Sequence, residues 1–210
     1  MQHCRKAMKF RGFLWTLWGL IFFVGCVGRS EYSLLPDVTL KAGDIVLRCG
    51  SGMTSRVVRF ADDGGIYSHV GIVVDSAGMM MVVHAVPDEH DTPDDVDRIK
   101  MDYPERFFSS IRANNGCVLR CIDSLAARRA ALVALGVYRR RVLFDHDYDI
   151  SDTTKMYCSE FVEYAYGKAA GFSITDGRRH DVNLPAIDFE DVILPSDFVE
   201  SSRLRTVVVF

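Results

Sequence analysis

The sequence predicts an α+β protein whose folded part is a single domain. Segments with the pattern of β-strands outnumber those with the pattern of helices, and three of the predicted helices are short. Of the 210 residues, 49% are apolar, which is enough to build one hydrophobic core in a chain of this length. No internal repeat or low-complexity tract divides the chain.

The first predicted elements include a β-hairpin. Residues 43–49 (GDIVLRC) form a short strand, and residues 51–61 have the spacing of a short amphipathic helix. Two apolar runs follow, residues 68–74 (SHVGIVV) and 79–86 (MMMVVHAV). The four residues between them, DSAG, are typical of a turn that joins two antiparallel strands.

After the hairpin, an acidic loop at residues 87–97 is followed by shorter elements. We expect the carboxylates of this loop to be solvated. The remaining predicted elements are, in chain order, a strand at 98–102, a helical turn at 103–110, a strand at 116–122, a helix at 125–140 capped by Asp123 or Ser124, a helix that carries Cys158, a long loop, a helical turn at 195–201 and a strand at 204–210.

The N-terminal residues have the layout of an export signal. Four basic residues within the first 11 precede 17 residues without charge. The segment FVGC at 23–26 resembles a bacterial lipobox, in which cleavage leaves a lipidated cysteine. We therefore expect a signal peptide at residues 1–25, a lipidated Cys26, a linker at 26–42 and a folded domain at 43–210.

Two alternatives for the N-terminal segment remain open. The apolar stretch is at the lower limit of what spans a bilayer, so it is also compatible with an uncleaved membrane anchor. Simple secretion without a lipid is the other alternative. With a lipid or an anchor, we expect an exported protein held at a membrane, in the periplasm or cell envelope of a bacterium.

The net charge and the cysteine pattern limit which partners and cofactors are expected. The net charge is −3, and it falls to −7 when residues 1–25 are removed, because they contain four basic and no acidic residues. This balance argues against nucleic acid as a partner. Neither C-x-x-C nor H-E-x-x-H occurs, so no metal and no cofactor is expected. The oligomeric state, and any disulfide among Cys49, Cys117 and Cys121, stay open.

Cys158 is the candidate nucleophile. It falls in the first turns of its predicted helix, for which Asp152, Thr153 or Thr154 are plausible N-caps. The positive end of a helix favours the thiolate, which is the reactive form of cysteine. The alternative is that Cys158 is a small, buried packing residue, as free cysteines usually are.

Two histidines on the predicted hairpin favour the catalytic interpretation. If Val74 lies opposite Met79, then His69 lies directly opposite His84 on the same face of the sheet, within reach of a hydrogen bond. A nucleophilic cysteine needs a base, and that base needs an orienting partner. We therefore expect Cys158 to lie over the sheet face that carries both histidines.

The chain resembles a known family from about residue 41 to its end. The segments GDIVL, YSHVGIVV, VVHAV, FDHDYDISDTTKMYCSEFV and LPSDFVESSRLRTV occur in the order seen in YaeF/YiiX-like permuted papain-like cysteine hydrolases, which are relatives of NlpC-type cell-wall peptidases. The resemblance implies a circularly permuted papain-like (NlpC-type) fold, in which an antiparallel sheet packs against the helix that bears the nucleophile.

The resemblance also implies roles for individual residues. Cys158 matches the nucleophile of the family, His69 its general base, and His84 the third position, where close relatives often carry glutamate. We therefore expect His84→Glu to be tolerated. The backbone N–H of Cys158 is the expected first oxyanion donor, and the neighbourhood of residues 43–45 or Tyr67 are candidates for the second.

Several acidic residues near the nucleophile have less specific roles. Glu160 and Glu163 follow Cys158 at helical positions that point away from it, so we expect them to be structural or surface groups. The carboxylates Asp145, Asp147 and Asp149 match an acidic motif of the family. They either shape the site, bind a substrate amine or are solvated.

The expected reaction is acyl transfer through a thioester on Cys158, with water as the usual acceptor. The leading hypothesis is an exported, membrane-associated hydrolase that cleaves an amide bond in a peptide or peptidoglycan fragment. The first alternative is a lipid esterase or acyltransferase of the permuted papain-like type, which acts on a lipid-derived acyl group. The second is a lipoprotein that keeps the fold as a non-catalytic binding module.

Overall fold

The computed structural model describes residues 31–184 and 187–210. The predicted signal peptide and Cys26 lie outside these described residues. Within them, no helix is long and apolar enough to cross a membrane. The compact unit comprises Glu31–Phe210. It therefore includes residues 31–42, which the sequence analysis assigns to a linker: Tyr32 and Leu34 form backbone hydrogen bonds with Ser110 and Phe108.

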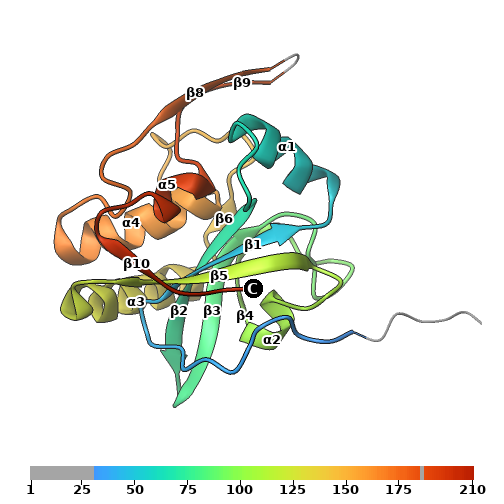
Figure 1. Ribbon diagram of the computed structural model, residues 1–210. Helices are drawn as coiled ribbons and strands as arrows, with labels where there is room; N and C mark the ends of the chain where they lie inside the picture. Colours follow the sequence, from blue (N-terminus) through green and yellow to red (C-terminus); the bar gives the residue numbers. More distant parts are fainter. Residues whose placement is uncertain (1–30, 185–186) are drawn as a thin grey trace, which may run out of the picture. The chain divides into compact units, whose positions relative to one another are not determined.

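The predicted α+β class is confirmed, with a mainly antiparallel sheet of eight strands in the order β10-β5-β1-β2-β3-β4-β6-β7 (Figure 1). Its strands are β1 (Ile45–Gly50), β2 (His69–Ser76), β3 (Met79–Val86), β4 (Arg98–Asp102), β5 (Ala113–Cys121), β6 (Leu143–Phe144), β7 (Lys155–Met156) and β10 (Leu204–Val209). The helices are α1 (Met53–Ala61), α2 (Pro104–Phe107), α3 (Ser124–Arg139), α4 (Cys158–Ala170) and α5 (Pro195–Val199). A separate hairpin, β8 (His180–Leu184) and β9 (Ile187–Val192), occupies the predicted long loop.

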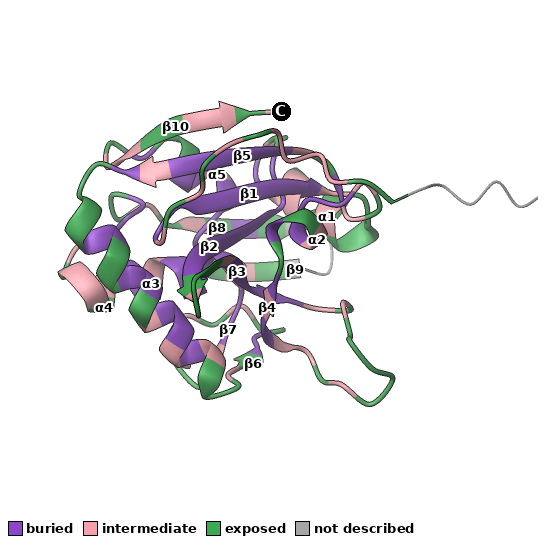
Figure 2. Cartoon of the chain, turned by 90° about the horizontal axis from the view of Figure 1, so that it is seen from below, coloured by how far each residue is buried: buried purple, intermediate pink, exposed green. Residues whose placement is uncertain are grey.

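Side chains alternate between the two faces of the sheet, and each face has its own core. Val70, Ile72 and Val83 contribute to the larger core, against which α3 and α4 pack. Val73 and Val82, which adjoin Ile72 and Val83 and point to the other face, contribute to the smaller core, which includes Phe107 and Phe108 at α2. Figure 2 shows the central strands buried, whereas α3 carries both buried and exposed residues.

The hairpin register differs from the prediction by two residues. Val74 pairs with Met81 and Ser76 with Met79, because the turn contains only Ala77 and Gly78. Both have positive φ angles, 56° and 84°, as a two-residue hairpin turn of type I′ requires. His84 therefore lies opposite Gly71 rather than opposite His69. The shift is an even number of residues, so both histidines remain on one face.

Candidate active site

Cys158 is the first residue of α4. The predicted N-caps, Asp152, Thr153 and Thr154, are not used: Tyr157 is the N-cap. The carboxylate of Glu160 accepts a hydrogen bond from the backbone N–H of Tyr157 at 3.2 Å. Glu160 thus closes the N-terminus of α4 and is structural, as expected.

His69 and His84 are in direct contact. Nε2 of His69 lies 2.8 Å from Nδ1 of His84, and the two rings meet edge to face with centroids 5.0 Å apart. The ring of Phe107 packs against both, at centroid distances of 5.6 Å and 5.1 Å. His84 is fully buried and His69 is 7% exposed. The pairing predicted from the sequence is therefore present, although it is diagonal across the ladder rather than direct.

Asp102, at the end of β4, extends the pair. Its Oδ2 atom lies 3.3 Å from Nε2 of His84. Burial by itself would raise the pKa of Asp102, but the hydrogen bond and charge of His84, together with Arg106 and Lys100, outweigh it and lower the pKa. Asp102 is thus an ionised carboxylate at neutral pH and can only accept a hydrogen bond.

This acceptor sets the tautomers of both imidazoles. Burial lowers the pKa of His84 to about 4, although the hydrogen bond to Asp102 opposes the shift. Burial, with the charges of Arg48 and His84, places the pKa of His69 well below its usual value. Both rings are therefore neutral at pH 7. Because Nε2 of His84 donates to Asp102, its Nδ1 accepts from Nε2 of His69. Nδ1 of His69 is then free to accept a proton.

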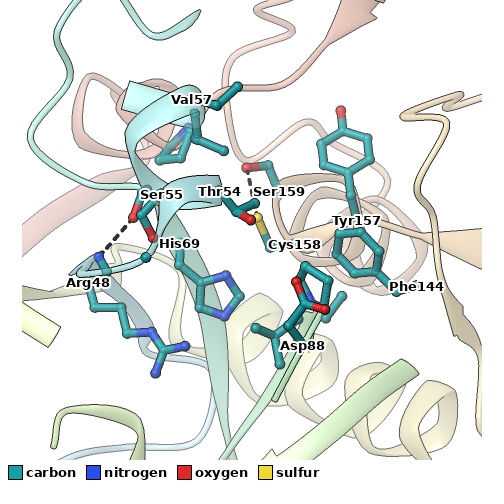
Figure 3. Close-up of a pocket in the computed structure, with 18 of the residues that line it drawn as sticks. Arg48, Thr54, Ser55, Val57, His69, Asp88, Phe144, Tyr157, Cys158 and Ser159 are labelled. Carbon is teal, nitrogen blue, oxygen red and sulfur yellow. Dashed lines mark hydrogen bonds between the residues drawn. The ribbon is translucent and has the colours of Figure 1, made fainter. Parts of the chain in front are cut away.

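The free side of His69 faces Cys158. Both residues line one cavity, and Figure 3 shows the imidazole of His69 beside Cys158 in this cavity. The sequence analysis predicts that Cys158 lies over the sheet face that carries the histidines, and this prediction is wrong. Helix α4 packs on the opposite face, in the core that contains Val70 and Ile72. The thiol of Cys158 accepts a hydrogen bond from the backbone N–H of Val70, the residue after His69.

The resting thiol is neutral, which corrects the expectation of a stabilised thiolate. Burial raises the pKa of Cys158, although hydrogen bonds from Ser159 and from the backbone N–H of Val70 oppose this effect. Desolvation therefore outweighs the helix terminus. Cys158 and His69 are therefore both neutral at pH 7.

The cavity has a volume of about 580 Å³. Most of its wall is apolar, with side chains from α1, from the β8–β9 hairpin and from the segments before α4 and α5. These include Val57, Phe144, Tyr148, Phe189 and Ile193. The polar part of the wall includes His69, Cys158, several serines and a group of charged residues described below.

The two candidates for a second oxyanion donor do not line this cavity. The backbone N–H groups of Gly43 and Asp44 donate to Val73 and Lys41, and Tyr67 is hydrogen bonded to Cys117. Neither Tyr67 nor residues 43–45 are among the residues that form the cavity wall. Both candidates are therefore wrong.

The other acidic residues that the sequence analysis singled out have structural roles. Glu163 accepts hydrogen bonds from the backbone of Ile174 and Thr175. Asp145 is fully buried and accepts from the backbone N–H groups of Asp147 and Asp149, at 3.0 Å and 2.7 Å. It thus organises the loop that precedes α4.

Comparison with known proteins identifies a fold. The chain is similar to the crystal structure of metalloprotein yiiX from Escherichia coli O157:H7, DUF1105, with a TM-score of 0.63 and 20% sequence identity. The match covers 80% of this chain and 96% of that chain. Neither a protein-family model nor a curated protein matches the sequence. The protein therefore has a YiiX-like fold.

Proposed function

We propose that the protein is an exported, membrane-associated cysteine hydrolase that cleaves an amide bond in a peptide or peptidoglycan fragment. One observation carries the proposal: the chain of contacts from Asp102 through His84 to His69, which leaves Nδ1 of His69 unprotonated beside Cys158. A structural histidine pair has no need of a free nitrogen that faces a thiol. The permuted papain-like assignment is part of this proposal.

The arrangement supports nucleophilic catalysis. The Cys158 thiol transfers its proton to Nδ1 of His69 while sulfur forms a bond to the substrate carbonyl carbon, whose π electrons move to oxygen. Collapse of this intermediate breaks the C–N bond, and His69 returns the proton to the departing amine. Water then attacks the thioester with His69 as base, which releases the acid and restores the thiol. His84 and Asp102 hold the imidazole and stabilise its charged form.

The apolar wall of the cavity favours a second candidate, the cleavage or exchange of a lipid acyl ester. The side chains that surround Cys158 are suited to an acyl chain, and the chemistry of the thioester step is the same for an ester and an amide. The leaving group, an alcohol or an amine, distinguishes the two candidates.

The E. coli protein is described as a metalloprotein, which raises the question of a metal ion in this chain. The residues that face Cys158 do not fit a resident metal ion. Beside Cys158, His69 offers one free nitrogen, whereas both nitrogens of His84 are engaged. Among residues 31–184 and 187–210, no group of three or more histidine, cysteine or acidic side chains is arranged to hold a metal. The proposed steps therefore involve none.

The proposal is tested by offering cell-wall peptide fragments and phospholipid to the same pure protein. We expect turnover of the peptide amide, abolished in Cys158→Ala and retained in Cys49→Ala, whose thiol lies outside the cavity. The small replacement should leave the unfolding midpoint of Cys158→Ala nearly unchanged. Full activity of Cys158→Ala, or loss of activity on treatment with a chelator, contradicts the mechanism. Turnover of phospholipid alone selects the second candidate.

A further inference from the structure

Beside the histidines, the cavity wall contains two arginines that share one carboxylate. Arg48 on β1 pairs with His69 across the ladder, and Arg112 precedes β5. Both guanidinium groups form ion pairs with Glu89. Arg48, Arg112 and Glu89 line the same cavity as Cys158. Figure 3 shows Arg48 and Cys158 on either side of His69.

Burying the charge of Arg48 at this place costs free energy. Its side chain is only 3% exposed, and burial lowers its pKa to about 10, although the charge of Asp102 opposes this effect. One Nη atom donates to the carbonyl of Phe107 at 2.8 Å. Nε is buried without a hydrogen-bond partner among the described residues. A charge buried at this cost, with an unused donor, is more typical of ligand binding than of stability.

The partner of the two arginines comes from a connecting segment rather than from the sheet. Glu89 belongs to the acidic loop between β3 and β4, and its side chain is 20% exposed. Lys100 on β4 holds the backbone carbonyl of the same residue. The loop therefore places one carboxylate at the end of the cavity, where the arginines present donors to it.

We propose that Arg48 and Arg112 form a subsite for a carboxylate of the substrate, and that Glu89 occupies this subsite as a resident stand-in until substrate displaces it. The group that fits is a carboxylate because a carboxylate already bridges both guanidinium groups. The inference rests on the proposed function, since Cys158 is taken as the reactive centre. It narrows the substrate to an acyl compound that carries a free carboxylate close to the bond that is cleaved.

The test measures how small acids protect Cys158 from alkylation in the full chain. Iodoacetamide labels Cys158, and N-acetylglycine or its neutral amide, N-acetylglycinamide, competes. We expect the acid to protect and the amide not to protect. In Glu89→Gln, which frees both arginines, protection should require an about tenfold lower concentration of the acid. In Arg112→Gln, protection should be lost.

Asp88→Asn is the matched control. Asp88 adjoins Glu89, lines the same cavity and contributes the same charge, but it forms no ion pair with either arginine. A gain in Asp88→Asn equal to that in Glu89→Gln would overturn the subsite, because it would reflect the general field alone. Equal protection by the acid and the amide, or protection by inorganic phosphate where N-acetylglycine gives none, would also overturn it. If iodoacetamide labels no Cys158 at all, the proposed function fails instead.

Discussion

Acidification should destabilise this protein largely through its buried histidine pair, and the effect of His84 can be worked out. In the unfolded chain His84 binds a proton below about pH 6.5, whereas in the folded chain its pKa is about 4. The contribution to stability is therefore fully present above pH 6.5 and is lost as the pH falls toward 4. The difference between the two pKa values corresponds to about 3 kcal/mol of unfolding free energy.

The charged neighbours of His84 do not mask this effect. Asp102, whose pKa is lowered, stays ionised between pH 7 and pH 4.5, as do Arg48 and Arg112. His69 contributes an effect of the same sign, because its pKa is also lowered. A variant that removes only His84 separates the two histidines. His84→Asn keeps a side-chain oxygen that can accept the hydrogen bond from Nε2 of His69.

Urea unfolding at pH 7.0 and pH 4.5 gives the measurement. Between these two values we expect the wild type to lose about 2 kcal/mol more unfolding free energy than His84→Asn, with unchanged denaturant slopes, because part of the full difference is lost only below pH 4.5. Equal losses in the two proteins would show that His84 is already protonated in the fold, or that it is solvated. The tautomer argument for His69 would then fail with it.

Two further substitutions examine the geometry of the relay. A Cβ atom at Gly71 would lie 2.8 Å from Val82 Cγ1 and 3.1 Å from His84 Cβ. Gly71→Ala should therefore displace His84 and lower turnover by about tenfold or more, with a smaller effect on the unfolding midpoint. Unchanged kinetics would mean that the histidine pair tolerates displacement. The sequence analysis expects His84→Glu to be tolerated, but this variant would place two carboxylates at the 3.3 Å contact with Asp102 and should be inactive. Adding Asp102→Asn should restore part of the activity. An active single variant would show that Asp102 does not face position 84.

The sequence correctly predicts that His69 and His84 lie on one face of the sheet, because the alternation of side chains is unchanged by a register shift of two residues. Counting DSAG as the loop moves the pairing by two residues, and an even shift leaves every side chain on its own face. What the shift changes is the residue opposite His84, which becomes Gly71. That detail depends on Ala77 adopting a positive φ angle, which its residue type does not favour.

Asp102 and Glu89 lie beyond sequence reasoning for a different reason. Asp102 reaches His84 because β4 pairs with β3 so that Lys100 is opposite His84 and Asp102 opposite Val82. A strand of five residues after an acidic loop does not reveal this register. The carboxylates of that loop are predicted to be solvated, yet Glu89 is bound by two arginines from distant strands and loops. Contacts of this kind can be predicted only when the order of the strands in the sheet is known.

In the proposed mechanism, the same topology allows the neutral pair of Cys158 and His69 to act as nucleophile and base. Arg48 and the buried surroundings keep His69 unprotonated, so the base is available at neutral and mildly acidic pH. Burial also keeps the resting thiol protonated, so in this mechanism the proton leaves Cys158 as the sulfur attacks the carbonyl group. Proton transfer then creates an imidazolium next to Arg48, a cost that the two hydrogen bonds leading to Asp102 offset. The proposed mechanism thus assigns the carboxylate of Asp102 to the second histidine, where it stabilises the charge while the pKa of His69 stays low.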